Sequence, residues 1–375
     1  MRAKGKKADS GPMDGTVVIG TYDGGLIGLR AGSGEQAFGY APHLGCVKSV
    51  ACSGGGRCAS GGTDHMVRLF DLAKGKELGE LQEHDDTVGC VEFWGATNLV
   101  TGGVDGLACI WRCSDFELLL KFRAHKSAMT CMAVHSSGKL MASAARDNSI
   151  RLWDLMRGTS AASVPVDEAA ESMLWSPSGN RLAALSAGIV TVVDVALGGA
   201  AAVWRNPTGS GLMRVALISV IFVREDELLV GDGKGEVRVL AFKPKDGGPD
   251  LVETCRLPAD ANRVRIKSIV GKHDDKGNLV FAIGTSSGRV EIWRFSAPGA
   301  GPATVECFQR MHEVETGVRL TCMAFWSGVS AQAAQEMSPL DEAMQELEDD
   351  EAAQDMVEAD RSLKTRKKAK RKRRG

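Results

Sequence analysis

Short apolar runs pattern the chain, with hydrophobic and polar residues alternating inside each run and Gly, Asp and Ser between runs. Two examples are TVVIGTYDGGLIGLRA near the start and RLTCMAFW (Arg319 to Trp326) near the end. Alternation at every second position, bounded by turn-forming residues, is typical of β-strands with one buried face. The glycine content, 45 residues against 11 prolines, also suits many tight turns. An all-β domain is therefore predicted for residues 14–328.

Three segments of this region repeat one another. They begin at His43, His84 and His125, which are 41 residues apart, and each ends in a strand-like run with Phe or Trp before an Asp or Arg. A period near 40 residues, with His early and Trp-Asp late, is the signature of WD repeats, each of which forms one four-stranded propeller blade.

The recurring polar residues predict one buried hydrogen-bonded set per blade. In such blades a chain of hydrogen bonds connects the His, a Ser or Thr of the second strand, the turn Asp and the Trp of the third strand. The sets are His43, Ser60 and Asp64; His84, Thr101, Asp105 and Trp111; and His125, Ser143, Asp147 and Trp153. The first set has Phe70 where the others have Trp. A hydrogen bond to a charged group contributes about 1.5–3 kcal/mol, so each set should fix the turn between the middle strands.

The remaining blades are predicted from weaker repeats. A fourth repeat ends at Asp194, a fifth includes GDGKGEVRVLAF, and a sixth ends near Trp293. The fourth lacks both the turn Asp and the Trp in SAGIVTVVDV. After the sixth only one strand is left, while extra strands precede His43. We therefore expect a seven-bladed WD-repeat β-propeller, closed when N- and C-terminal strands share the seventh blade and so remove free sheet edges.

Charged segments flank the predicted propeller. We expect residues 1–13 to be a basic, flexible N-terminus and residues 329–360 to be an acidic segment with a helix from about Pro339 to Ala359. The segment 361–375 is a polybasic tail in which ten of fifteen residues are Lys or Arg, among them Lys364, Arg366, Lys367, Lys368, Lys370, Arg371, Lys372, Arg373 and Arg374. Two compatible interpretations stay open for this tail: a nuclear or nucleolar targeting signal, and contact with RNA phosphates. No aromatic residue lies among the lysines, so base stacking by the tail is not expected.

The same sequence argues against catalysis, cofactors and metals. His, Ser and Asp are the residue types of a hydrolase triad, but here they recur blade after blade, as a structural device would. GSGEQA (Gly32 to Ala37) matches the residue pattern of a dinucleotide-binding fingerprint. However, it lies between two short predicted strands, whereas that fingerprint requires a strand followed by a helix. Asp341, Glu342, Glu346 and Glu348 lack the spacing of a calcium loop. The ten cysteines include no Cys-x-x-Cys pair and are too few for a disulfide scaffold. An intracellular, non-catalytic protein is predicted, with no small-molecule substrate and no membrane segment.

Several stretches resemble one WD-repeat family in particular. PHLGCVKSVA, SGGTDHMVRLFDL and RAHKSAMTCMAVHSSGKLMASAARDNSIRLWDL closely resemble the p21-activated-kinase-interacting protein family. The likeness is strong from about Gly20 to Leu155, weaker across the fourth to sixth blades, and extends to the polybasic end. It implies a nucleolar propeller that joins early precursors of the large ribosomal subunit, and a second reported role in negative regulation of p21-activated kinases.

The resulting expectation is a scaffold for nucleolar assembly of the large ribosomal subunit, acting in precursor rRNA processing. Its expected partners are large-subunit pre-ribosomal proteins and rRNA, the latter through the basic tail, in the nucleus and nucleolus. The alternative is a signalling adaptor that negatively regulates a p21-activated protein kinase. A propeller with cationic ends favours the first, since a kinase adaptor has no need of attraction to phosphate.

Overall fold

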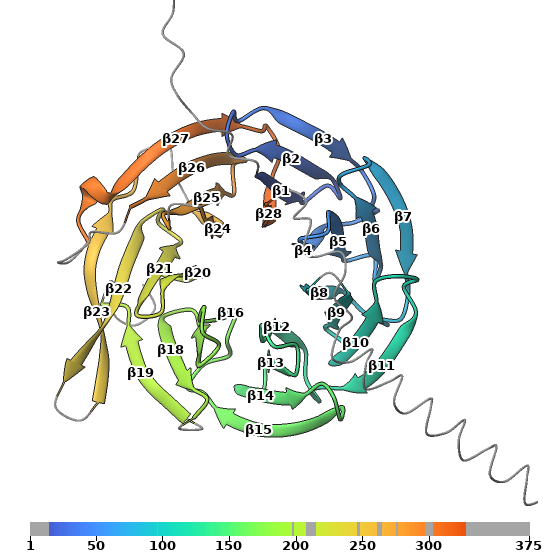
Figure 1. Cartoon of the computed structure of the whole chain (residues 1–375), viewed down its shortest axis with the longest axis horizontal. Coiled ribbons are helices and arrows are strands. Elements are labelled where there is room, and N and C mark those ends of the chain that lie inside the picture. Colours follow the sequence, from blue (N-terminus) through green and yellow to red (C-terminus); the bar gives the residue numbers. More distant parts are fainter. Residues whose placement is uncertain are drawn as a thin grey trace, which may run out of the picture.

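The computed structural model describes residues 15–327 apart from residue 96 and the segments 197–198, 208–214, 246–247, 261–264, 275–276 and 297–302. Within this part of the chain, 28 strands form seven four-stranded antiparallel sheets. The sheets stand around a central axis like the blades of a propeller (Figure 1). The predicted seven-bladed propeller is confirmed. The expected C-terminal helix and basic tail lie outside the described residues.

Each blade runs from an innermost strand at the axis to an outermost strand at the rim. Blades 1 to 3 comprise β4 (Val47–Cys52), β5 (Arg57–Gly62), β6 (Val67–Asp71), β7 (Lys76–Leu81), β8 (Val88–Trp94), β9 (Asn98–Gly103), β10 (Leu107–Arg112), β11 (Leu118–Arg123), β12 (Met129–Val134), β13 (Leu140–Ala145), β14 (Ser149–Asp154) and β15 (Thr159–Pro165). Blades 4 to 6 comprise β16 (Ser172–Trp175), β17 (Arg181–Leu185), β18 (Ile189–Asp194), β19 (Gly199–Arg205), β20 (Leu217–Arg224), β21 (Glu227–Asp232), β22 (Val237–Lys245), β23 (Gly248–Leu257), β24 (Ile266–His273), β25 (Leu279–Thr285), β26 (Arg289–Phe295) and β27 (Phe308–Glu315). A short 3-10 helix, η2 (Val305–Cys307), precedes β27.

Blade 7 joins the two ends of the described chain. It consists of β28 (Leu320–Trp326), β1 (Thr16–Thr21), β2 (Leu26–Arg30) and β3 (Gln36–Tyr40), in that order from the axis outward. β28 pairs antiparallel with β1, with Ala324 opposite Val18 and Leu320 opposite Thr21. The predicted closure of the ring by N- and C-terminal strands is therefore confirmed, and neither strand is left as a free edge.

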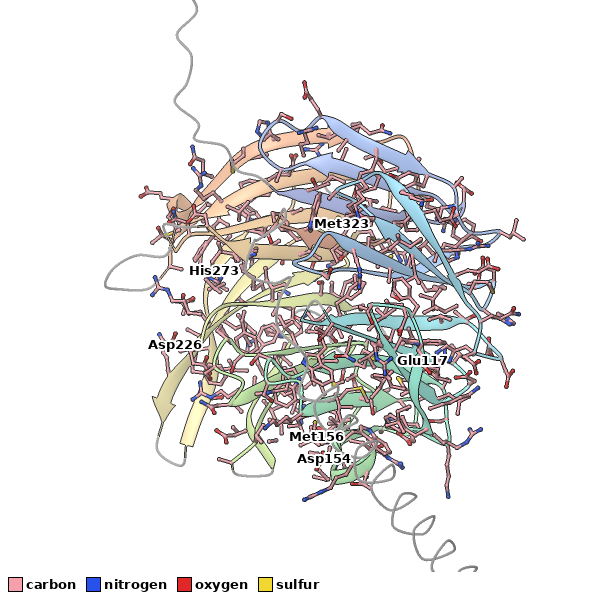
Figure 2. All side chains as sticks on the ribbon, turned by 45° about the vertical axis from the view of Figure 1, so that its right-hand side comes forward. Glu117, Asp154, Met156, Asp226, His273 and Met323 are labelled. Atoms are coloured by element: carbon pink, nitrogen blue, oxygen red, sulfur yellow. The ribbon has the colours of Figure 1, made fainter. Side chains whose placement is uncertain are left out.

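Burial follows the position of a strand within its blade. The second strands β9 and β25 are buried at every residue, whereas the outermost strands β7 and β15 are mostly exposed. A second strand has a neighbouring blade on each of its faces, so both sets of alternating side chains are covered. Among the described residues, hydrophobic clusters form between every pair of adjacent blades, and the last pair is blade 7 with blade 1. Met323 of β28, labelled in Figure 2, contributes to the cluster between blades 6 and 7.

The antiparallel order gives the propeller two different faces. On one face the chain enters each innermost strand and turns from the second strand into the third; we call this the entry face. The opposite face carries the turns between the first and second strands and between the third and fourth strands. The repeated His and turn Asp of the sequence analysis precede the first strand and follow the second strand, so both lie toward the entry face.

Candidate functional site

The blade 2 set is held together by hydrogen bonds from loop to strand to turn. His84 Nε2 lies 2.9 Å from Thr101 Oγ1, and His84 Nδ1 lies 3.1 Å from Asp105 Oδ2. The indole Nε1 of Trp111 donates to Thr101 Oγ1 at 3.1 Å. The Asp105 carboxylate also accepts the backbone N–H groups of Asp85 and Leu107. The loop before β8, strand β9, the following turn and strand β10 are thereby joined in one network.

Blade 3 repeats this arrangement. His125 Nε2 lies 2.8 Å from Ser143 Oγ, Trp153 Nε1 donates to the same oxygen at 2.9 Å, and His125 Nδ1 lies 3.3 Å from Asp147 Oδ2. Burial lowers the pKa of His125, and the hydrogen bond to Asp147 only partly opposes this, so the ring is neutral. Burial works to raise the pKa of Asp147, but hydrogen bonds from Ser149 and His125 outweigh it and lower that pKa. A neutral imidazole that donates from Nδ1 and accepts at Nε2 satisfies all of these contacts.

Blade 1 keeps the polar part of the set and replaces the indole with stacked rings. His43 Nε2 lies 2.7 Å from Ser60 Oγ, and its Nδ1 lies 3.0 Å from both carboxylate oxygens of Asp64. Phe70 has no N–H to donate, and its ring stacks on Tyr40 with centroids 5.1 Å apart. The rim strand of blade 7 is thus packed against blade 1 by aromatic contact.

The three hydroxyl groups of these sets are closed off from solvent. Ser60, Thr101 and Ser143 are each 0% exposed. In blades 2 and 3 the oxygen already has an imidazole and an indole as partners. A nucleophile must reach a substrate atom and an oxyanion site, and these oxygens can reach neither. The arrangement fixes turns and positions loops; it does not form an attacking group.

Blade 5 uses a buried arginine in place of the histidine set. Arg238 of β22 is 0% exposed, and its Nη2 lies 3.0 Å from Asp232 Oδ2 and 2.6 Å from Glu236 Oε2. Its Nε lies 3.6 Å from Glu253 Oε2 on the neighbouring rim strand. Burying a guanidinium is costly unless acidic partners surround it, and here three carboxylates do.

Blade 6 has a related ion-pair network. Trp293 Nε1 donates to Glu291 Oε2 at 2.9 Å, and Arg289 Nε lies 3.1 Å from Glu291 Oε1. Arg289 Nη2 also contacts Asp260, at 3.1 Å, and Glu313, at 3.0 Å. The networks of blades 5 and 6 were not predicted from the sequence. The available signal was an Arg in the third strand close to an acidic residue, in GEVRV and GRVEIW.

Blade 4 departs from the repeat as its sequence indicates. The turn between β17 and β18 contains Ser186, whose hydroxyl donates to the Glu168 carbonyl at 3.0 Å. The Trp175 indole of β16 donates across the blade boundary to the Ala133 carbonyl at 2.9 Å. Hydrogen bonds to backbone carbonyls thus take the place of the side-chain set in this blade.

Comparison with known proteins agrees with these features. The model of the WD domain, G-beta repeat matches residues 34–71, 75–112 and 116–154. A p21-activated protein kinase-interacting protein 1-like of Danio rerio is 29% identical over 317 residues, which cover 83% of this chain and 80% of that protein. The Gallus gallus protein of the same name is 28% identical over 315 residues, with the same two coverages. The p21-activated protein kinase-interacting protein 1 of Homo sapiens is 27% identical over 282 residues, or 75% of this chain and 66% of that protein. The chain thus carries matches to the WD repeat and is similar to p21-activated-kinase-interacting proteins over most of its length.

The resemblance inferred from the sequence is thereby confirmed. Solved structures support the fold independently. The structure of U3-55K superposes with a TM-score of 0.64 at 17% identity, covering 72% of this chain and 84% of that one. The crystal structure of RRP9 WD40 repeats gives a TM-score of 0.63 at 17% identity, covering 72% and 83%. At such low identity the likeness concerns the fold alone.

Several predicted features lie outside the described residues. These are the segments 1–13 and 329–360 and the tail 361–375, including Lys364, Arg366, Lys367, Lys368, Lys370, Arg371, Lys372, Arg373 and Arg374. Within the described residues, no helix is both long and apolar enough to cross a bilayer. The same part of the chain contains no cluster of three or more His, Cys, Asp or Glu side chains suited to holding a metal ion.

Proposed function

We propose that this protein is a non-catalytic propeller scaffold in nucleolar assembly of the large ribosomal subunit, where it supports processing of precursor rRNA. The WD-repeat propeller is typically a scaffold, and its closed ring offers two faces and a rim to several partners at once. Hydrogen-bonded sets and ion-pair networks hold the blades, so these surfaces are rigid before any partner arrives.

This proposal rests on the positive charge of residues 361–375, which follow the propeller in the sequence. Ten of the last fifteen residues are Lys or Arg, although the whole chain has a formal net charge of -1. A cationic segment attracts phosphate by releasing condensed counterions, without reading sequence. A rigid protein-binding body joined to such a segment suits assembly of particles made of both RNA and protein, in the nucleus and its nucleolus.

A second candidate function follows from the names of the relatives, which describe interaction with a p21-activated protein kinase. In that function the protein would be an adaptor that binds the kinase through the propeller and lowers its activity. The two functions differ in what they require of the tail, because kinase binding by the propeller needs no attraction to phosphate.

Depletion of the protein separates the two functions. We expect depleted cells to accumulate unprocessed precursors of large-subunit rRNA, measured by hybridisation, and re-expression of the full chain to restore processing. A chain lacking residues 361–375 should remain folded but accumulate less in the nucleolus. Normal rRNA maturation after depletion, together with raised p21-activated kinase activity, would contradict the assembly function and support the kinase adaptor.

A further inference from the structure

Two lysines and an arginine lie at the entry-face ends of neighbouring innermost strands in blades 6, 7 and 1. Lys48 and Lys267 are exposed, and each follows the first buried residue of an innermost strand, Val47 of β4 and Ile266 of β24. Strand β28 of blade 7 lies between these two strands in the ring (Figure 1). The two lysines therefore lie on either side of β28, near the entry-face ends of innermost strands.

Arg319 adds a third cation beside them. It is exposed, directly precedes β28, and its guanidinium lies over the ring of Tyr22 at 4.6 Å from the centroid. Burial raises the pKa of the Cys46 thiol, and Lys48, Arg319 and Lys267 each act against that rise. The three cations thus lie within electrostatic reach of one thiol, and Asp23 acts on it in the opposite sense.

Apolar surface borders these cations. Leu44 is 97% exposed and Tyr22 is 51% exposed, values unusual for such side chains in a well-packed propeller. The two lie on adjoining loops, because Gly24 O accepts the backbone N–H of His43 and a Cβ on Gly24 would collide with the carbonyl of His43. We call Tyr22, Leu44, Lys48, Lys267 and Arg319 the entry-face patch.

Elsewhere on the entry face, blade 3 also exposes two cations, Lys126 and Arg146, whereas blades 2 and 4 are acidic. Blades 2 and 4 expose Asp85, Asp86, Asp167 and Glu171 there. Within the described residues, Lys48, Lys267 and Arg319 make no ion pair with a carboxylate. The three cations outnumber Asp23, the carboxylate that acts on the same Cys46 thiol, so the local potential stays positive and favours an anionic partner.

We propose that the entry-face patch binds an acidic peptide segment of a partner protein. Carboxylates of the segment would approach Lys48 and Lys267, and an apolar side chain beside them would cover Leu44 and the edge of Tyr22. A single-stranded RNA fits less well, because it needs a cationic groove along its backbone and several rings for stacking. Here the cations form one compact group, Asp23 is exposed beside them, and Arg319 covers one face of the patch's single ring.

Binding of a defined probe by the full chain tests this proposal. The probe is a short fluorescein-labelled peptide of Asp and Glu residues around a central Leu-Phe pair, followed by fluorescence anisotropy. We expect the double variant K48E/K267E to bind it about tenfold more weakly, because two attractions become repulsions. The matched control is K126E/R146E, which makes the same change of charge at two exposed positions of blade 3 on the same face. The control should bind within about twofold of the parent, and both variants should melt like the parent.

Each outcome shows whether the patch binds the acidic peptide. All three chains retain the tail, so binding through the tail is common to them and cancels in the comparison. Equal affinities of K48E/K267E and the control variant would overturn the proposal. It would also be overturned if K48E/K267E lost affinity for a fluorescein-labelled oligouridylate but not for the peptide, since the patch would then be an RNA site. The patch can bind such a peptide whether or not the protein joins ribosomal precursors, and the depletion experiment tests the latter separately.

Discussion

The Ser143 hydroxyl of β13 connects three elements of blade 3 by hydrogen bonds. It receives the Trp153 indole N–H from β14 and lies 2.8 Å from His125 Nε2, which belongs to the loop before β12. Because Ser143 is fully buried, water cannot replace a partner that is lost. Removing one member of the set should therefore also reduce what the other members contribute to the stability of the blade.

A double-mutant cycle measures that dependence. Trp153→Phe removes the indole donor and keeps most of the ring, as Phe70 does naturally in blade 1. Ser143→Ala removes the shared oxygen. We expect each change to lower the free energy of unfolding, with a coupling energy of about 1 kcal/mol measured by urea denaturation. Strictly additive effects of the two substitutions would show that the hydrogen bond contributes nothing.

Glu92 makes the stability of the propeller depend on pH. This residue of β8 accepts the backbone N–H of Val134 on β12 at 2.9 Å. Burial raises its pKa from the ordinary value of 4.5 to about 8, and that hydrogen bond only partly offsets the rise. The folded state thus favours the protonated carboxyl, so its contribution to stability is complete below pH 4.5 and is lost as the pH rises to about 8. We expect Glu92→Gln to gain stability relative to the parent across this range, measured by denaturation at a series of pH values. A constant difference between the two proteins would contradict this assignment.

At the scale of elements, neighbouring blades interlock through the turns between their first and second strands. Trp94 at the end of β8 packs against Gly138 in the corresponding turn of blade 3. One blade further on, the His135 ring meets Trp175 edge-on, with centroids 5.0 Å apart. Large rings of one blade therefore occupy the space that a glycine turn leaves in the next.

Two glycines of these turns allow the packing to be separated from the backbone. Gly95 and Gly138 both have positive φ angles, 61° and 68°, so alanine strains the backbone equally, by about 1–2 kcal/mol. A Cβ on Gly95 would meet only Thr97 Oγ1, at 4.0 Å, whereas one on Gly138 would overlap the Trp94 ring. We expect Gly138→Ala to lower the melting temperature far more than Gly95→Ala, in a thermal melt followed by circular dichroism. Similar losses would mean that the Trp94 contact is unimportant.

The regular elements were predictable, and the irregular polar networks were not. The spacing of His84, Asp105 and Trp111 is local in sequence, so it indicated the blades directly. Closure by β28 followed from counting strands that lacked partners. The environment of Arg238 was only partly signalled by the acidic residue near it in GEVRV, because its partner Glu253 lies on another strand. The entry-face patch likewise depends on the ring closure that brings distant strands together.

At the scale of the whole molecule, the ring joins parts of the chain that are far apart in sequence. The Thr321 hydroxyl lies 2.9 Å from the Gly20 carbonyl and 2.7 Å from the Val47 carbonyl, and so links β28 with both β1 and β4. Closure leaves a rigid body, and in the proposed assembly function this body would bind proteins while the tail would be attracted to phosphate. These two kinds of contact respond differently to salt, since exposed charges are screened much more than buried contacts.

Sedimentation of the protein with ribosomal precursors tests the proposed assembly function most directly. Nuclear extracts would be run on sucrose gradients at low and at moderate salt, with the full chain and a chain lacking residues 361–375 compared in parallel. We expect the full chain to migrate with large-subunit precursors, with an association that weakens as salt rises by a log–log slope of about 0.7 to 0.9 per phosphate contact. The truncated chain should associate less at low salt and respond less to added salt, because only propeller contacts remain. Recovery of the full chain only in light fractions, near its own mass, at both salt concentrations would contradict the assembly function.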